Sequence, residues 1–262
     1  MGKASRIKAE KRKTPPPVGK QQGVSQRTIL YVTIGVIAVI VAGAVAYSQL
    51  KSSPKAPPPA AASAADKGAP ASLVKAAAAI GFTPRTEAGV GQIESQPASA
   101  AQAPSNPNLL PVGTTAPDFT LETPAGQTVS LASYRGKATL LEFFATWCPH
   151  CDAEAPNLKK TLAALPRSKY GWISVNADGE TAPSVYAYHR YFGLKDPALL
   201  DPSSQPGSWT QQGAPGKVTT AYQVAAFPTF YVVDPNGKIT WTSDGEQPNA
   251  LILQQLKKAA GA

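Results

Sequence analysis

Residues 141–151 read LEFFATWCPHC and carry the strongest fold signal of the chain. The apolar first half of this stretch predicts a buried strand over residues 137–144, and the loop from Trp147 onward opens a predicted helix over residues 149–165. Cys148 then lies on the loop and Cys151 in the first helical turn, where their sulfurs can close a small ring. The amides and dipole of the helix N-terminus favour a thiolate at Cys148. These are the only two cysteines of the chain, and their spacing predicts redox chemistry.

Three other uses of the cysteine pair are less well supported. A zinc site needs four ligands, and only His150 and His189 remain as soft ligands. A c-type haem attachment site needs histidine directly after the second cysteine, where Asp152 stands. An inert pair would place both thiols between a strand and a helix by coincidence.

The remainder of residues 109–262 predicts one α/β domain. Apolar runs predict three further strands and two further helices, and Gly-containing turns predict two hairpins. The strands are predicted at 172–176, 229–233 and 238–242, and the helices at 184–192 and 250–259. One hairpin is predicted over residues 119–131, and the other has its turn at 235–237. Such a mixture predicts a central sheet covered by helices on both faces.

The region before this domain divides into three parts. Residues 1–27 hold eight Lys or Arg and one acid, a net charge of +7 out of +9 for the whole chain, so the basicity does not indicate a nucleic-acid partner. Residues 28–47 carry no charge and are long enough to cross a bilayer as one helix. The positive-inside rule then predicts a cytoplasmic tail, a single-pass membrane anchor and an extracytoplasmic domain. A cleavable signal is the alternative, since residues 44–46 read Ala-Val-Ala.

Residues 48–108 are rich in Pro, Ala and Ser and predict a disordered linker. Within the linker, residues 72–80 consist of good helix formers and are followed by Gly81. They predict either a short helix docked on the domain or merely Ala-rich linker.

Several motifs in order give residues 109–262 a family resemblance. The stretch 141–151 resembles the active-site strand and loop of the thioredoxin superfamily, and is most similar to its membrane-anchored TlpA/ResA-like branch. The segments VG at 112–113, APDF at 116–119, FPTF at 227–230 and DPNGK at 234–238 also fit this branch. The resemblance implies a thioredoxin-like fold, thiol–disulfide oxidoreductase activity and no cofactor or metal.

The resemblance also implies a role for each site residue. Cys148 is the expected nucleophile and Cys151 the resolving thiol, the two forming a redox-active disulfide. Glu142 matches a buried acid that moves protons for the resolving cysteine, and its apolar neighbours predict a raised pKa. Glu154 matches an acid of the TlpA/ResA branch.

Three residues are expected around the substrate. Pro228 matches a cis-proline opposite the cysteines, which lets an extended substrate segment approach. The resemblance implies that Trp147 and Phe227 contact this substrate. Phe227 is bulkier than its counterpart in many relatives.

The direction of electron flow stays open. Pro-His between the cysteines, with His150 near the thiolate, is typical of a strong disulfide donor, whereas the branch consists mostly of reductases. His150 is expected to tune the potential without a proton role. Expected partners are protein thiols or disulfides outside a bacterial cell membrane, a membrane electron donor or acceptor and the lipid bilayer.

Two other functions bear on the same residues. A peroxiredoxin requires proline and threonine where Leu141 and Ala145 stand, which excludes that class. A copper-binding metallochaperone on the same fold remains the alternative, with His189 as the third ligand beside the two sulfurs. Otherwise His189 is expected on the helix surface or packed beneath it.

Overall fold

The computed structural model describes residues 68–87, 90–91, 106–203 and 214–261. The expected tail, the expected anchor and residues 48–67, 88–89 and 92–105 of the expected linker lie outside these ranges. Within the described ranges, no helix is long and apolar enough to cross a membrane.

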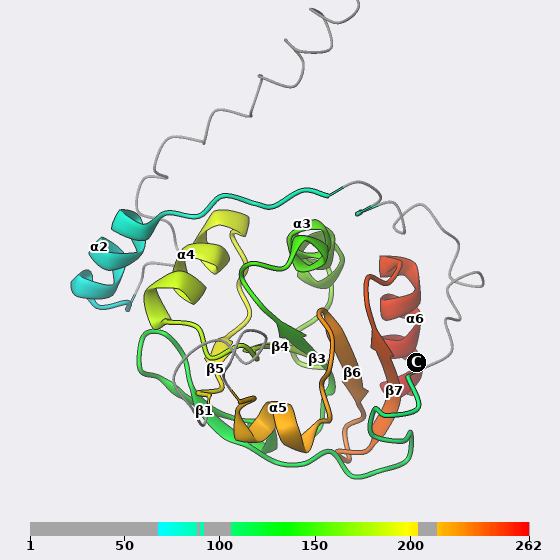
Figure 1. Cartoon of the computed structure of the whole chain (residues 1–262). Coiled ribbons are helices and arrows are strands. Elements are labelled where there is room, and N and C mark those ends of the chain that lie inside the picture. The colour runs from blue at the N-terminus through cyan, green and yellow to red at the C-terminus, as the bar shows by residue number, and fades with distance from the viewer. Residues whose placement is uncertain (1–67, 88–89, 92–105, 204–213, 262) are drawn as a thin grey trace, which may run out of the picture. The chain divides into compact units, whose positions relative to one another are not determined.

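A seven-stranded mixed sheet forms the centre of the domain, in the order β2-β1-β5-β4-β3-β6-β7 (Figure 1). β3 pairs in parallel with β4 and β4 with β5, whereas β3–β6, β6–β7, β1–β5 and β1–β2 are antiparallel. The strands are β1 (Thr120–Glu122), β2 (Thr128–Ser130), β3 (Ala138–Phe144), β4 (Tyr170–Asn176), β5 (Ala198–Leu200), β6 (Thr229–Val233) and β7 (Ile239–Asp244). The central β3 is buried at every residue. The predicted α/β architecture is confirmed, and its topology is thioredoxin-like.

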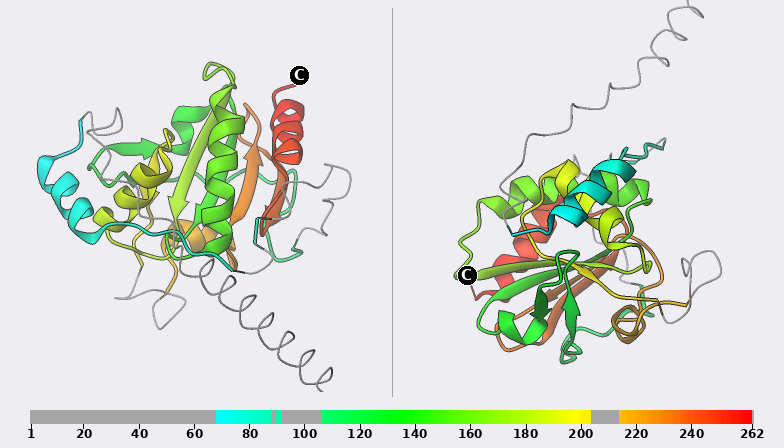
Figure 2. Two further views of the ribbon diagram at one scale, coloured as in Figure 1. Left: turned by 90° about the horizontal axis from the view of Figure 1, so that it is seen from above. Right: turned by 90° about the vertical axis from the view of Figure 1, so that its left-hand side faces the viewer.

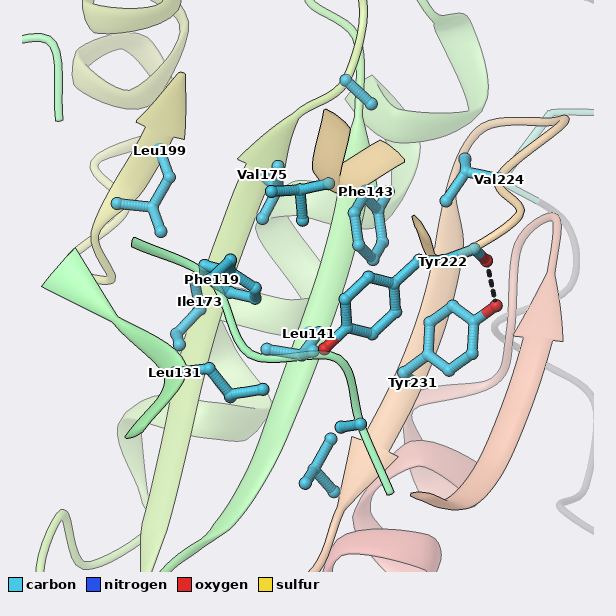
Figure 3. Close-up of a cluster of buried hydrophobic side chains, with 14 of the residues drawn as sticks. Phe119, Leu131, Leu141, Phe143, Ile173, Val175, Leu199, Tyr222, Val224 and Tyr231 are labelled. Carbon is cyan, nitrogen blue, oxygen red and sulfur yellow. Dashed lines mark hydrogen bonds between the residues drawn. The ribbon is translucent and has the colours of Figure 1, made fainter. Parts of the chain in front are cut away.

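Helices cover both faces of the sheet (Figure 2). On one face lie α3 (Pro149–Ala163), α4 (Ala182–Phe192) and α6 (Asn249–Ala259), and on the other lie the short α5 (Lys217–Ala221) and the 3-10 turn η3 (Leu131–Tyr134). Because strand side chains alternate, Leu141 and Phe143 of β3 join the α5 side, where Tyr222 and Tyr231 fill the core (Figure 3). Glu142 consequently faces the α3 side.

The predicted elements match the structure to within a few residues. β3, α3, β4, α4, β6, β7, α6 and both hairpins lie where the sequence predicts them. The sequence did not predict β5, α5 and η3, which have five residues or fewer and carry little periodic signal. β5 nevertheless joins the hairpin strand β1 to the main sheet, with Glu122 opposite Leu200.

Part of the expected linker belongs to the folded domain, which corrects the prediction of disorder for that part. α2 (Ala71–Ile80) packs on α4, with Leu73 and Ala77 buried against Tyr186 and Ala187. The apolar face of α2 is therefore the physical reason that this segment folds. Of the two alternatives for residues 72–80, the docked helix is the correct one.

The segment after α2, residues 81–87 and 90–91, is called the strap here. It runs from α2 past α4 to α3 (Figure 1). The ring of Phe82 packs edge-on against Tyr188 and Phe192 of α4, at centroid distances of 5.1 and 5.6 Å. The backbone N–H of Arg85 then donates to Asp152 Oδ2 in the first turn of α3, at 2.6 Å. The strap thus connects the expected linker to the helix that carries the cysteines.

Candidate active site

The junction between β3 and α3 places the two cysteines as the sequence predicts. Cys148 is the N-cap of α3, and its Sγ accepts a hydrogen bond from the backbone N–H of Cys151 at 3.3 Å. Pro149 occupies the first helical position, where its missing N–H costs nothing. Both cysteines are buried and are free thiols in this structure. The arrangement holds one thiol at a helix N-terminus with a second thiol one turn away.

The two thiols have opposite electrostatic properties. A hydrogen bond from the Cys151 side chain lowers the pKa of Cys148, and backbone N–H groups and His150 lower it further. Burial raises the pKa of Cys151 well above its usual value, and the neighbouring Cys148 adds to this. Cys148 is therefore the thiol that ionises more readily, and Cys151 is the thiol that keeps its proton.

Glu142 lies on the same face of the sheet as the cysteine helix. Its carboxylate is 3% exposed and accepts hydrogen bonds from Ser174 Oγ at 2.8 Å and from Trp172 Nε1 at 3.3 Å. Burial raises its pKa to about 8, and the charge of Asp196 adds to this shift. The charge of this carboxyl group also raises the pKa of Cys151. A buried acid with a pKa near neutrality is suited to exchange protons with the resolving thiol.

The other wall of the site is the loop before β6. The Phe227–Pro228 peptide bond is cis, and the Cys148 thiol donates to the carbonyl oxygen of Phe227 at 3.6 Å. The rings of Trp147 and Phe227 pack edge to face at 5.9 Å between centroids. The structure therefore brings Trp147, Cys148, Phe227 and Pro228 together, as the sequence predicted.

His150 has a partner that the sequence did not indicate. Its side chain is 47% exposed, and Nδ1 lies 2.6 Å from Oε1 of Glu246, in the loop after β7. Because a carboxylate only accepts, Nδ1 carries the hydrogen and the ring orientation is fixed. The other oxygen of Glu246 accepts from the backbone N–H of Gly91 in the strap, at 2.8 Å. One carboxylate thus holds both the histidine between the cysteines and the strap.

Glu154 lies on the buried side of α3. Its Oε2 accepts from the backbone N–H of Gln247 at 3.1 Å, and its side chain is 3% exposed. Gln247 follows Glu246, so Glu154 fixes the loop that contacts His150.

Two acids that follow β4 also contact the site, and the sequence did not predict them. Asp178 Oδ2 accepts from Trp147 Nε1 at 2.6 Å, and Glu180 Oε2 accepts from the backbone N–H of Thr146 at 2.7 Å. β4 is the parallel neighbour of β3, so the carboxyl ends of the two strands meet at one edge. The run NADGE at 176–180 could therefore have been assigned to the rim of the site.

His189 is a packing histidine. It is 8% exposed and its ring lies against those of Phe144 and Tyr188, at 5.6 and 5.9 Å. Burial lowers its pKa. In the part of the chain that the structure describes, no group of three or more His, Cys, Asp or Glu is placed to hold a metal ion.

Comparisons with known proteins relate this chain to a family. The model of the AhpC/TSA family matches residues 112–242. The thiol-disulfide oxidoreductases ResA of Geobacillus thermodenitrificans and Geobacillus kaustophilus are 32% and 34% identical over 146 residues, which covers 56% of this chain and 76% of each relative. A crystal structure of a putative thiol:disulfide interchange protein DsbE from Chlorobium tepidum is 25% identical, covers 58% of this chain and 99% of its own, and has a TM-score of 0.49. The chain therefore belongs to the AhpC/TSA family, as a thioredoxin-like thiol–disulfide oxidoreductase related to the ResA proteins.

Proposed function

We propose that this protein is tethered to the cell membrane and exchanges disulfides with proteins outside it, through Cys148 and Cys151. The opposite pKa shifts of the two thiols at the start of α3 carry the proposal. They support attack by Cys148 and resolution by Cys151. The related ResA proteins are named thiol-disulfide oxidoreductases, which is the same chemistry.

The reaction proceeds in two exchanges. The Cys148 thiolate attacks one sulfur of a substrate disulfide, a Cys148–substrate bond forms and the first substrate thiolate leaves. Cys151 then gives its proton to Glu142 and attacks Cys148 Sγ. The Cys148–Cys151 disulfide forms and the second substrate thiolate leaves, so two electrons have passed to the substrate. Run backward, the same steps oxidise a dithiol.

Substrate binding follows from the wall formed by Phe227 and Pro228. The proline has no N–H, and the Phe227 carbonyl already faces Cys148 Sγ. An extended segment that carries the target sulfur would pair with this backbone edge, as in other cases of strand addition. Trp147 and Phe227 would flank the segment.

Membrane tethering is supported by the sequence. Residues 28–47 are uncharged and follow a tail of net charge +7, whereas only Lys51 and Lys55 closely follow them. This asymmetry favours a cytoplasmic N-terminus. The catalytic domain would then lie outside the membrane.

The location is testable because the chain has only two cysteines. In intact cells, a membrane-impermeant maleimide should label the reduced full-length protein, which should sediment with membranes. A Ser5→Cys variant that lacks both native cysteines should be labelled only after lysis. Labelling of the native pair only after lysis, or a soluble protein, would refute the proposed topology.

His150 should set the direction of exchange. Its backbone N–H and its charge both help to lower the pKa of Cys148 and so stabilise the reduced form. Replacing His150 with proline should therefore make the couple more reducing, by about 30 mV or more, which is about 1.4 kcal/mol for two electrons. Equilibration with glutathione measures this potential. His150→Lys, which keeps a positive charge, should shift it less, and an equal shift in both variants would contradict the electrostatic explanation.

A further inference from the structure

One hydroxyl group joins Glu142 to a second carboxyl group. Glu142 on β3 and Ser174 on β4 are register partners, and Ser174 Oγ lies 2.8 Å from Glu142 Oε2. The same Oγ lies 2.6 Å from Oδ2 of Asp196, which stands just before β5. Side chains from two adjacent parallel strands and from the loop before a third strand thus form a continuous line.

The two contacts of the Ser174 hydroxyl require one proton more than a serine and two ionised carboxylates carry. A serine hydroxyl carries one hydrogen, and an ionised carboxylate can only accept. Two short O···O contacts to one hydroxyl are both hydrogen bonds only if one of the two carboxyl groups is protonated. Burial raises the pKa of Glu142 and of Asp196, which favours such a shared proton.

Two arrangements of this proton satisfy the geometry. In one, Glu142 carries it and donates to Ser174, which donates to Asp196. In the other, Asp196 carries it and donates to Ser174, which donates to Glu142. Conversion of the first into the second moves the proton from Glu142 to Asp196 and leaves Glu142 ionised.

Asp196 lines a cavity of about 360 Å³ on the flank of the domain. Four cationic side chains line the same cavity, and Asp196 Oδ1 is buried without a hydrogen-bond partner among the described residues. The cations are Lys137, Lys159, Arg167 and Lys195. The titratable groups that act on Asp196 from the surrounding elements are His189, Arg167, Tyr134 and Glu142. The three side chains therefore connect the buried Glu142 with a cavity that water can enter.

We propose that Ser174 and Asp196 form a proton path that connects Glu142 with this cavity. The path rests on the role of Glu142 as the base for Cys151. Each oxidation of the thiol pair releases the proton of Cys151, and each reduction takes one up. At neutral pH, transfer to Asp196 produces the ionised Glu142 that accepts the next proton.

The test separates the two exchanges with a chromogenic aromatic disulfide, 5,5′-dithiobis(2-nitrobenzoate), on the reduced full-length protein. Cys148 attack releases the first nitrothiobenzoate ion, and Cys151 attack on the mixed disulfide releases the second. Because the leaving group departs as a thiolate, the proton of Cys151 is the only one that the second phase must move.

Asp196→Asn is the decisive variant because the two explanations predict opposite signs. If Asp196 acts only by its charge, its removal lowers the pKa of Glu142, and the second phase at pH 7 is unchanged or faster. As part of the path, its loss should slow the second phase about tenfold and leave the first within about twofold. Ser174→Ala should slow the second phase equally, Ser174→Thr should restore it, and the double variant should be no slower than either.

Asp201→Asn is the matched control, because Asp201 is a buried acid just after β5 that bonds Thr219 instead. It should leave both phases unchanged. If Asp196→Asn does not fold, Asp196→Ala replaces it. A second phase that is unslowed at pH 7 in the folded variant would overturn the path. If Glu142→Gln also leaves it unslowed, the role of Glu142 fails first, and if Cys148 releases no first ion, the proposed function fails.

Discussion

Replacing Cys148 with serine should abolish disulfide exchange. The thiol with the lowered pKa is then lost, and Cys151 cannot replace it because burial keeps its pKa far above neutrality. Replacing Cys151 with serine should have a different result. Attack by Cys148 still occurs, but no thiol resolves the product, so the mixed disulfide with the substrate accumulates.

Turnover is measured by insulin reduction, and the trapped mixed disulfide is detected by non-reducing gel electrophoresis. Cys148→Ser should give the rate without protein, and Cys151→Ser should give one added band that disappears with reductant. The double variant serves as the control for both. Turnover by Cys148→Ser, or a trapped species in that variant, would reverse the assignment of the two thiols.

Replacing Glu142 with glutamine should slow the resolving exchange by about a hundredfold, a usual contribution of general acid–base catalysis. In the native protein the pKa of Glu142 is raised to about 8. The ionised form, which accepts the proton of Cys151, therefore increases as the pH rises from 6 to 8, and the rate should increase with it. The variant should lose this dependence.

Stopped-flow recording of the second phase between pH 6 and 9 measures both effects. Asp201→Asn again provides a buried-acid control, which should keep the native profile. A native rate that does not change between pH 6 and 8, or an unchanged profile in Glu142→Gln, would contradict the role of Glu142 as the base.

The same raised pKa affects stability. Between the unfolded pKa of 4.5 and the folded value of about 8, the unfolded chain loses the proton of Glu142 while the native protein keeps it. The free energy of unfolding therefore falls by about 1.4 kcal/mol for each pH unit in this window. Below pH 4.5 the contribution is fully present, and above pH 8 it is lost. Urea titrations of Glu142→Gln should lack this slope.

The sequence predicts the parts of the site that are local. A cysteine pair between an apolar strand and a helix fixes the position of Cys148, and the apolar neighbours of Glu142 correctly indicate that its carboxyl group is buried. Pro228 is recognised from the surrounding motif, and it is indeed preceded by a cis bond. These features depend on a few adjacent residues.

The parts that the sequence does not predict arise from contacts between distant elements. Ser174 reaches Glu142 only because β4 pairs with β3 in one register, and a slip of one residue would turn it to the other face. Glu246 meets His150 across 96 residues. No periodic pattern encodes either contact. For α2, composition permitted both a helix and a linker, and burial against α4 decided between them.

The strap precedes in the chain the residues whose side chains bond to it, so it is synthesised before them. Arg85 and Gly91 bond to Asp152 and Glu246, which follow 67 and 155 residues later in the chain. Synthesis proceeds from the N-terminus, so the strap cannot close until the last strand and its loop have been made. Contacts between residues that are so distant in the chain also form late, since their loops are expensive to close. In a newly made domain, we therefore expect the cysteine loop and α3 to form before the strap docks beside them.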